Sequence, residues 1–192
     1  MKIGICQYSP VWENPEYSIK IIKSLLENYN QTDLLIFPEM TLTGFTMNAK
    51  NFAEDIDGKT FNFFMTKAVE LKTDIFFGVI ENDENKIYNS LIHIDKNGLI
   101  VARYRKIHPF SLANEDKNYF AGDELVITKI NNTRIALSIC YDLRFPELYR
   151  LYVKKGIDII VNIANWPIKR IDHYSTLLKA RAIENQCFAI GV

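Results

Sequence analysis

The amino-acid sequence predicts an α/β protein: a four-layer αββα sandwich in which two mixed β-sheets pack together under outer helices. Short segments that are apolar throughout alternate with longer segments whose apolar residues recur at helical spacing. Strands without a polar face are usually covered on both faces, which places helices outside the sheets. A polar turn that contains Gly98 separates two strand-like segments and predicts an antiparallel hairpin, so the sheet is mixed.

The first half of the chain is expected to contain five strands and two helices. Pro15 suits the first turn of a helix, and an apolar stripe follows it at Ile19, Ile22, Leu25 and Leu26. A second helix is expected over 61–71, where apolar residues recur at the same spacing. The expected strands cover residues 2–8, 33–37, 74–80, 87–94 and 99–104.

The second half repeats this alternation. Asn131 and Asn132 join two expected strands, and Pro146 opens a short helix that ends near residue 153. A longer helix is expected over 172–185. The expected strands of this half cover residues 125–130, 134–139, 158–164 and 187–192.

Composition places the chain among ordinary globular proteins. Its 192 residues are 48% hydrophobic and 24% charged, and 23 basic side chains balance 23 acidic ones. This balance argues against binding to nucleic acid or to an anionic membrane. Three widely spaced cysteines form neither a disulfide framework nor a zinc motif, and no run of about 18 apolar residues occurs. We therefore expect a cytoplasmic protein that folds as one domain over 1–192.

Cys140 is the candidate nucleophile. It follows an apolar run at 134–139 and precedes the helix opened by Pro146, so its side chain is expected at a sheet edge that a substrate can reach. A thiol attacks a carbonyl group at neutral pH only with a base or a lowered pKa. The sequence around Cys140 alone also fits a small buried hydrophobe, and that interpretation is favoured for Cys6 and Cys187.

Glu39 and Lys106 are the candidate base and the candidate oxyanion-stabilising cation. Glu39 follows the buried segment 33–37, at the end of a strand where α/β sheets collect their ligands. Lys106 follows the second hairpin strand, and its compact ammonium group suits an oxyanion. Each residue has an ordinary alternative, because single loop acids and loop cations are commonly solvated. His108 and His173 remain further candidates for a Cys–His pair.

The motifs around these three residues resemble those of a known family. They are FPEM around Glu39, YRKIHPF around Lys106 and SICYDLRFPELYR around Cys140. Together and in this order they resemble the nitrilase superfamily of carbon–nitrogen hydrolases, which is defined by a Glu-Lys-Cys triad. The similarity covers almost the whole chain and includes AGD at 121–123, NWP at 165–167 and KARAIENQ at 179–186.

The resemblance implies a mechanism of amide hydrolysis that needs neither a metal nor an organic cofactor. Glu39 takes the proton of Cys140, and the sulfur attacks the amide carbon while Lys106 and the backbone N–H of Tyr141 hold the oxyanion. Ammonia leaves, and water then hydrolyses the thioester. The resemblance also implies a second active-site glutamate, Glu115, which orients Lys106 or the substrate. The sequence around Glu115 alone equally fits a solvated loop acid.

Two motifs, CYDLRFPELYR and ANWP, resemble the omega-amidase branch, which deamidates monoamides of short 2-oxo dicarboxylic acids such as 2-oxoglutaramate. A substrate of this kind carries a carboxylate that a cation must meet. Arg144 is the candidate, and a structural ion pair with Glu147 or Asp142 is an equal alternative. Trp166 and Phe145 are expected to wall the pocket, although both also fit as core aromatics.

The chain departs from the family in length. Family members continue past the position of Val192 with strands that complete the sandwich, so we expect the C-terminal strands to be missing here. Family members also pair commonly as dimers, and a homodimer or higher homo-oligomer is therefore expected. Two alternatives to an omega-amidase are another small-amide or carbamoyl hydrolase of the same family and a truncated, non-catalytic interaction module.

Overall fold

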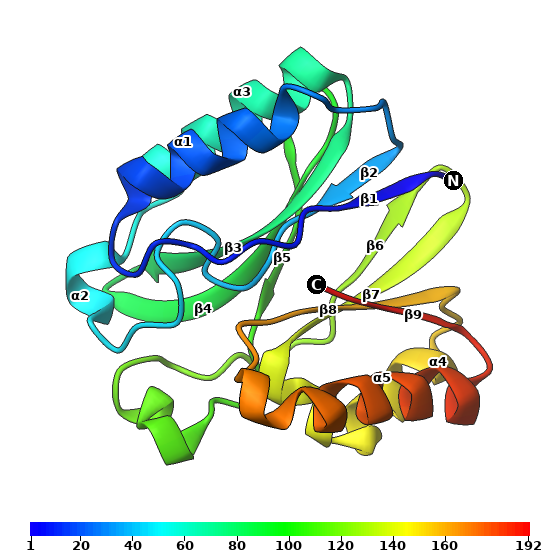
Figure 1. Cartoon of the computed structure of the whole chain (residues 1–192). Helices are drawn as coiled ribbons and strands as arrows, with labels where there is room; N and C mark the ends of the chain where they lie inside the picture. The colour runs from blue at the N-terminus through cyan, green and yellow to red at the C-terminus, as the bar shows by residue number, and fades with distance from the viewer.

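Two β-sheets lie face to face between two layers of helices in the computed structural model, which describes residues 1–192 (Figure 1). The first sheet has the strand order β1-β2-β3-β4-β5 and the second has the order β6-β7-β8-β9. The strands are β1 (Ile3–Ile5), β2 (Leu34–Ile36), β3 (Asp74–Asp83), β4 (Lys86–Ile94), β5 (Ile100–Arg105), β6 (Ile127–Ile130), β7 (Thr133–Ile139), β8 (Ile159–Ile163) and β9 (Phe188–Gly191). The helices are α1 (Pro15–Leu26), α2 (Ala49–Phe52), α3 (Lys59–Leu71), α4 (Pro146–Lys154) and α5 (Ile171–Asn185). The predicted αββα sandwich is confirmed.

Both sheets are mixed. Strands β1, β2 and β3 run parallel, whereas β4 and β5 each run antiparallel to the preceding strand. In the second sheet β6 is antiparallel to β7, and β7, β8 and β9 are parallel. The predicted hairpin joins β4 to β5, and Gly98 has a φ of +82° there. A further hairpin joins β3 to β4 through Glu84 and Asn85, whose φ values of 50° and 67° match the twist of the adjoining strands.

The expected strand over 2–8 is shorter in the structure than the sequence predicts. It includes only Ile3–Ile5, and the last hydrogen bond to β2 runs from the backbone N–H of Cys6 to the carbonyl oxygen of Ile36, at 2.9 Å. Beyond this point the chain leaves the sheet and passes towards α1. Apolar residues alone do not specify a strand at a sheet edge, because a loop also buries them when it crosses the core.

Helices cover the outer face of each sheet, as Figure 1 shows: α1 and α3 lie on the first sheet, and α4 and α5 lie on the second. Asn14 caps α1 by accepting a hydrogen bond from the N–H of Tyr17 at 3.1 Å, and Pro15 occupies the first turn as predicted. On the first sheet, Phe64 of α3 stacks on Phe77 with ring centroids 4.3 Å apart. No helix in the structure combines the length and the apolar character needed to cross a membrane.

The two sheets share one apolar core, which places their strand ends side by side. Ile36 and Phe76 of the first sheet belong to the same buried cluster as Ile135 and Leu137 of the second. The chain leaves β2, β5, β7 and β8 at one common edge of this core, because these strands point the same way within their sheets. Loops that follow four distant strands therefore meet there, where α/β proteins collect their ligands.

Candidate active site

Lys106 lies between two carboxylates in the interior of the protein. Its Nζ is 3.0 Å from Oε1 of Glu39, and it is 3.0 Å and 2.9 Å from the two carboxylate oxygens of Glu115. All three side chains are buried, with exposed fractions of 1% for Lys106 and 0% for both glutamates. Three of the predicted residues thus form one charged cluster, and Glu115 is not a solvated loop acid.

The positive charge of Lys106 is held firmly in this cluster. Burial by itself lowers the pKa of Lys106, but the carboxylate of Glu39, and that of Glu115, outweigh burial and place the pKa above its ordinary value. Burial raises the pKa of Glu115, and the ammonium of Lys106 opposes that rise. A fixed ammonium in a site that excludes water is suited to stabilise a developing oxyanion.

Cys140 ends β7 at the start of a 3₁₀ turn, η3 (Cys140–Arg144). Its φ of +45° lies in the left-handed region, which is strained for any residue other than glycine. A nucleophile on such a sharp turn is presented at the sheet edge rather than packed into the strand. The residue is 9% exposed and lines a cavity, so the structure places the thiol where a substrate can reach it.

The surroundings of Cys140 keep its thiol protonated at neutral pH. Burial and the negative charge of Glu39 raise the pKa of Cys140 well above its ordinary value, against the opposing charge of Lys106. A neutral thiol is a weak nucleophile, so attack requires a base that removes the proton as the sulfur–carbon bond forms. Of the charged groups around the thiol, Glu39 has the largest effect on its pKa.

Asp142 joins the loop of Cys140 to the loop of Lys106. Its carboxylate accepts hydrogen bonds from the hydroxyl of Tyr104 at 2.6 Å and from the backbone N–H of Ile139 at 2.9 Å. It also accepts from the backbone N–H of His108 at 3.0 Å and lies 2.8 Å from Nδ1 of that ring. The fully buried carboxylate therefore ties together the ends of β5 and β7, one in each sheet.

Replacing Asp142 by asparagine should destabilise the protein. The amide keeps the size of the carboxylate but turns one acceptor into a donor that faces other donors, which costs about 2–3 kcal/mol of the free energy of unfolding. Urea denaturation measures this loss. Asp116→Asn, at an exposed position in the neighbouring loop, is the matched control and should leave the stability unchanged. Equal stability of the two variants would contradict the role assigned to Asp142.

A cavity of about 230 Å³ opens beside Cys140, and most of the predicted substrate-binding residues line it. Tyr141 and Trp166 form part of its wall together with Arg144. The complete lining is Phe45, Phe110, Ala113, Cys140, Tyr141, Arg144, Asn165, Trp166, Pro167 and Arg170. No carboxylate side chain belongs to this set, so the cavity favours an uncharged or negatively charged ligand.

Arg144 forms no ion pair with Glu147 or Asp142, the structural alternative considered from the sequence. Its guanidinium group lies 5.2 Å from the ring centroid of Trp166 and 3.5 Å from Nδ1 of His173. The cation is therefore available to the cavity. Its contacts are aromatic and weakly polar, which leaves its hydrogen-bonding capacity largely unused.

Phe145 does not line the cavity. Its ring stacks on His108 with centroids 3.7 Å apart and an interplanar angle of 7°, and its edge meets Tyr141. This differs from the expectation that Phe145 walls the pocket. The ring supports the loop after Lys106, because His108 is two residues further along that loop.

Two asparagines bind the charged cluster without having been candidates from the sequence. The backbone N–H of Asn165 donates to Oε2 of Glu39 at 2.7 Å, and its side-chain amide donates to the Glu39 carbonyl oxygen. The side-chain amide of Asn89 donates to Glu39 at 2.7 Å and to Glu115 at 2.8 Å. A polar residue within the apolar strand of Asn89 is the one local signal for this contact, because a buried amide needs partners.

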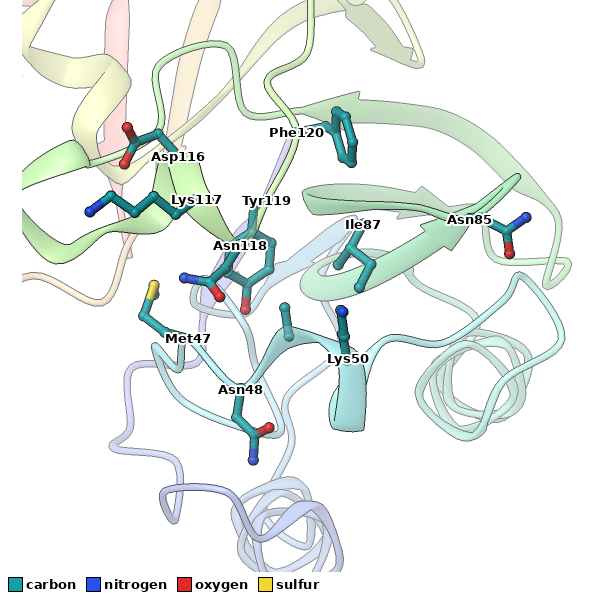
Figure 2. Close-up of a pocket in the computed structure, with 11 residues that line it drawn as sticks. Met47, Asn48, Lys50, Asn85, Ile87, Asp116, Lys117, Asn118, Tyr119 and Phe120 are labelled. Atoms are coloured by element: carbon teal, nitrogen blue, oxygen red, sulfur yellow. The ribbon is translucent and has the colours of Figure 1, made fainter.

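A larger hollow, of about 530 Å³, lies on another part of the surface. Figure 2 shows it between α2, the β3–β4 hairpin and the segment that follows Glu115. Tyr119 lies at its base, and its hydroxyl donates to the carbonyl oxygen of Thr46 at 2.6 Å. The hollow contains neither Cys140 nor the charged cluster, so the smaller cavity is the candidate active site. No group of three or more His, Cys, Asp or Glu side chains within 1–192 is arranged to hold a metal ion.

Comparison with known proteins identifies the family. The family model described as carbon-nitrogen hydrolase matches residues 2–192. The chain belongs to the carbon–nitrogen hydrolase family. This carbon–nitrogen hydrolase is similar in structure to a CN-hydrolase superfamily protein from Xanthomonas campestris, with a TM-score of 0.92 and 34% identity over the whole chain and 75% of that protein. The predicted nitrilase superfamily and its fold are confirmed.

Relatives in the omega-amidase branch are similar over nearly the full chain. This carbon–nitrogen hydrolase is 35% identical to omega-amidase YafV of Yersinia enterocolitica, over 100% of its own length and 73% of that protein. It is 33% identical to 2-oxoglutaramate amidase of Bacillus subtilis, over 97% of its own length and 73% of that protein. The chain therefore spans about three quarters of the length of these relatives.

Proposed function

We propose that this protein is an amidase that converts a small carboxamide into a carboxylic acid and ammonia through a thioester on Cys140. The observation that carries this proposal is the buried cluster of Glu39, Lys106 and Glu115 beside Cys140, which lines a cavity. This arrangement places a buried base and a buried, fixed cation next to a nucleophile that lines one cavity.

The first half of the reaction acylates the enzyme. Glu39 removes the thiol proton of Cys140 as the sulfur forms a bond to the amide carbon, and the carbonyl oxygen becomes an oxyanion. The ammonium of Lys106 and the backbone N–H of Tyr141 stabilise that oxyanion. Glu39 then gives the proton to the amide nitrogen, the carbon–nitrogen bond breaks, and ammonia leaves behind a thioester.

The second half returns the enzyme to its starting state. Glu39 removes a proton from a water molecule, whose oxygen attacks the thioester carbon, and Lys106 again holds the oxyanion. The carbon–sulfur bond then breaks, the sulfur of Cys140 receives the proton back, and the carboxylic acid departs. Oε2 of Glu39 accepts only one protein hydrogen bond, from Asn165 at 2.7 Å, so it keeps a free lone pair for these transfers.

We propose an anionic monoamide of the 2-oxoglutaramate type as the substrate. The unpaired guanidinium of Arg144 at the cavity wall supports this class, because it is suited to meet a carboxylate with two parallel hydrogen bonds. The similarity to omega-amidase YafV and to 2-oxoglutaramate amidase supports it independently. The absence of acidic side chains from the cavity lining agrees with a negatively charged ligand.

Ammonia release from a panel of amides tests the proposed function. The panel contains 2-oxo monoamides, neutral amides of similar length and carbamoyl amino acids. Before the assay, light scattering measures the molar mass of the protein and so tests the expected homo-oligomer. Turnover of the 2-oxo monoamides is the expected result. Preferred release of ammonia from carbamoyl compounds would replace this substrate class by another within the family, and a folded protein without any turnover would reject the amidase.

Arg144→Gln should reduce the use of anionic amides selectively. Losing one charge-assisted contact lowers kcat/KM for a 2-oxo monoamide by about 10- to 100-fold, whereas a neutral amide such as butyramide should change little. Arg150→Gln, at an exposed position on α4, is the matched control and should retain the activity on both substrates. An equal loss on the anionic and the neutral amide would exclude Arg144 as the carboxylate partner.

A further inference from the structure

Asn89, on β4, contacts the carboxylates of Glu39 and Glu115 and the backbone of Lys106. Its Nδ2 donates to Oε1 of Glu39 at 2.7 Å and to Oε1 of Glu115 at 2.8 Å. Its backbone carbonyl oxygen accepts the backbone N–H of Lys106 at 2.9 Å. The residue is 1% exposed, so these contacts form where water does not compete.

The two N–H groups of the Asn89 amide offset the excess negative charge of two neighbouring carboxylates. Glu39 and Glu115 approach the same ammonium of Lys106, which leaves two negative charges facing one positive charge inside the protein. Hydrogen bonds to the charged form of a carboxylate stabilise that form. Because both bonds of Asn89 begin at one nitrogen atom, they also determine how far apart the two carboxylate oxygens lie.

Asn89 is a poor choice for stability alone. Its Oδ1 is buried and has no hydrogen-bond partner, which is unfavourable for folding. Rotating the amide would not relieve this, because the oxygen would then face two carboxylates. An apolar side chain of the same size would leave no orphaned acceptor in the core. The amide is therefore explained by its contacts in the active site and not by stability.

We infer that Asn89 is a positioning residue of this active site, which holds Glu39 and Glu115 apart in their ionised forms on either side of Lys106. The inference rests on the proposed amidase mechanism, in which Glu39 must be ionised to accept the thiol proton. Asn89 acts through the two glutamates and does not touch the reacting atoms.

The electrostatics of Glu115 agree with this role. Burial, which is the largest effect, and the charge of Glu39 raise the pKa of Glu115. The ammonium of Lys106 and the hydrogen bond from Asn89 lower it. Removing the amide therefore raises the pKa of Glu115 further. The charged and titratable groups around Glu39 and Glu115 are Lys106, Tyr119, Cys140 and Tyr174.

The test compares Asn89→Ser with Asn89→Ala. The two side chains leave nearly the same space, but only serine keeps a donor. For Asn89→Ala we expect kcat to fall at least about tenfold at neutral pH with little change in KM, the size of one lost hydrogen bond to a charge. The acidic limb of the pH profile should move up by about one pH unit, because the pKa of Glu115 rises when the hydrogen bond from the amide is lost. Asn89→Ser should lie between alanine and the unchanged protein.

Asn162→Ala provides the matched control. Asn162 is also a fully buried asparagine with an orphaned Oδ1, but its amide donates to the hydroxyl of Ser138 at 3.1 Å and not to a carboxylate. This variant should change the melting temperature and leave the position of the acidic limb unchanged. An equal shift of the limb in Asn89→Ala and Asn162→Ala would overturn the inference, because general loosening of the core would then explain both.

A second readout separates this inference from the substrate proposal. Acylation by p-nitrophenyl acetate, followed as release of p-nitrophenolate and corrected with Cys140→Ala, reports attack by the thiol without any amide. If the acidic limb of this acylation moves to higher pH from the unchanged protein to Asn89→Ser and further to Asn89→Ala, the inference is supported even when the amide panel gives no turnover. If folded Asn89→Ser and the unchanged protein give the same pH profile, the inference is overturned even when amides are hydrolysed. If Asn89→Ala does not fold, the comparison of Asn89→Ser with the unchanged protein decides.

Discussion

Replacing Cys140 by alanine abolishes amide hydrolysis and leaves the fold intact. Without the sulfur no thioester forms, and loss of a covalent nucleophile lowers kcat by on the order of 10⁵-fold or more. Alanine removes one small buried group and keeps the backbone of η3, so circular dichroism and the melting temperature should change little. Cys140→Ser should be equally inactive, because its hydroxyl is a far weaker acid than a thiol and the carboxylate of Glu39 is too weak a base to remove its proton.

Cys187→Ala is the control for this experiment. Cys187 is half-buried, lies outside the cavity and contacts none of the charged groups of the site. Its variant should hydrolyse amides at the rate of the unchanged protein. Retained turnover in Cys140→Ala would reject the thioester mechanism, and a loss of activity in Cys187→Ala would show that the assay depends on a second thiol.

Replacing Lys106 by alanine should impair both the reaction and the stability. The oxyanion loses its ammonium partner, which lowers kcat by about 100-fold or more. The carboxylates of Glu39 and Glu115 lose the cation that lies about 3 Å from each of them, and breaking such a buried pair costs about 3–5 kcal/mol of the free energy of unfolding. Steady-state kinetics below the melting transition measures the first effect, and urea denaturation measures the second.

The stability lost in Lys106→Ala should depend on pH with a definite sign. Burial already raises the pKa of Glu115, and without Lys106 that pKa rises further. A carboxyl group whose folded-state pKa is raised destabilises the protein only where the unfolded chain is ionised, above a pH of about 4.3. The variant should therefore lose little stability in acid and progressively more as the pH rises towards neutral.

Lys129→Ala is the matched control for Lys106→Ala, because Lys129 is exposed on β6 and is remote from the cavity. It should retain both kcat and stability at every pH. An unchanged kcat in Lys106→Ala would exclude the lysine from oxyanion stabilisation. A loss of stability that is equal in acid and at neutral pH would show that packing, and not the pair of carboxylates, accounts for the destabilisation.

Local sequence accounts for the candidate nucleophile, base and cation of the site. Glu39, Lys106 and Cys140 each end or follow a strand, within short motifs that local reasoning identifies. The hairpin at Gly98 and the helix start at Pro15 are local in the same way, because the conformation of one residue determines them. Features that depend on a few neighbouring residues are therefore readable from the chain.

Contacts between distant segments are decided only by the packing of the two sheets. Asn89 and Glu39 are 50 residues apart, and Asn165 and Glu39 are 126 apart, so no local pattern connects them. The direction of Phe145, towards His108 and away from the cavity, likewise depends on which loop packs against it.

The fold class, the family and the candidate roles of Glu39, Lys106 and Cys140 follow from strand patterns and motifs, which are local properties of the chain. The burial of Glu115 against Lys106, the unpaired state of Arg144 and the bridge of Asn89 between two carboxylates emerge only when the two sheets pack together. Hydrogen bonds and charge interactions act over a few ångströms in space, and sheet register and packing determine which groups come that close.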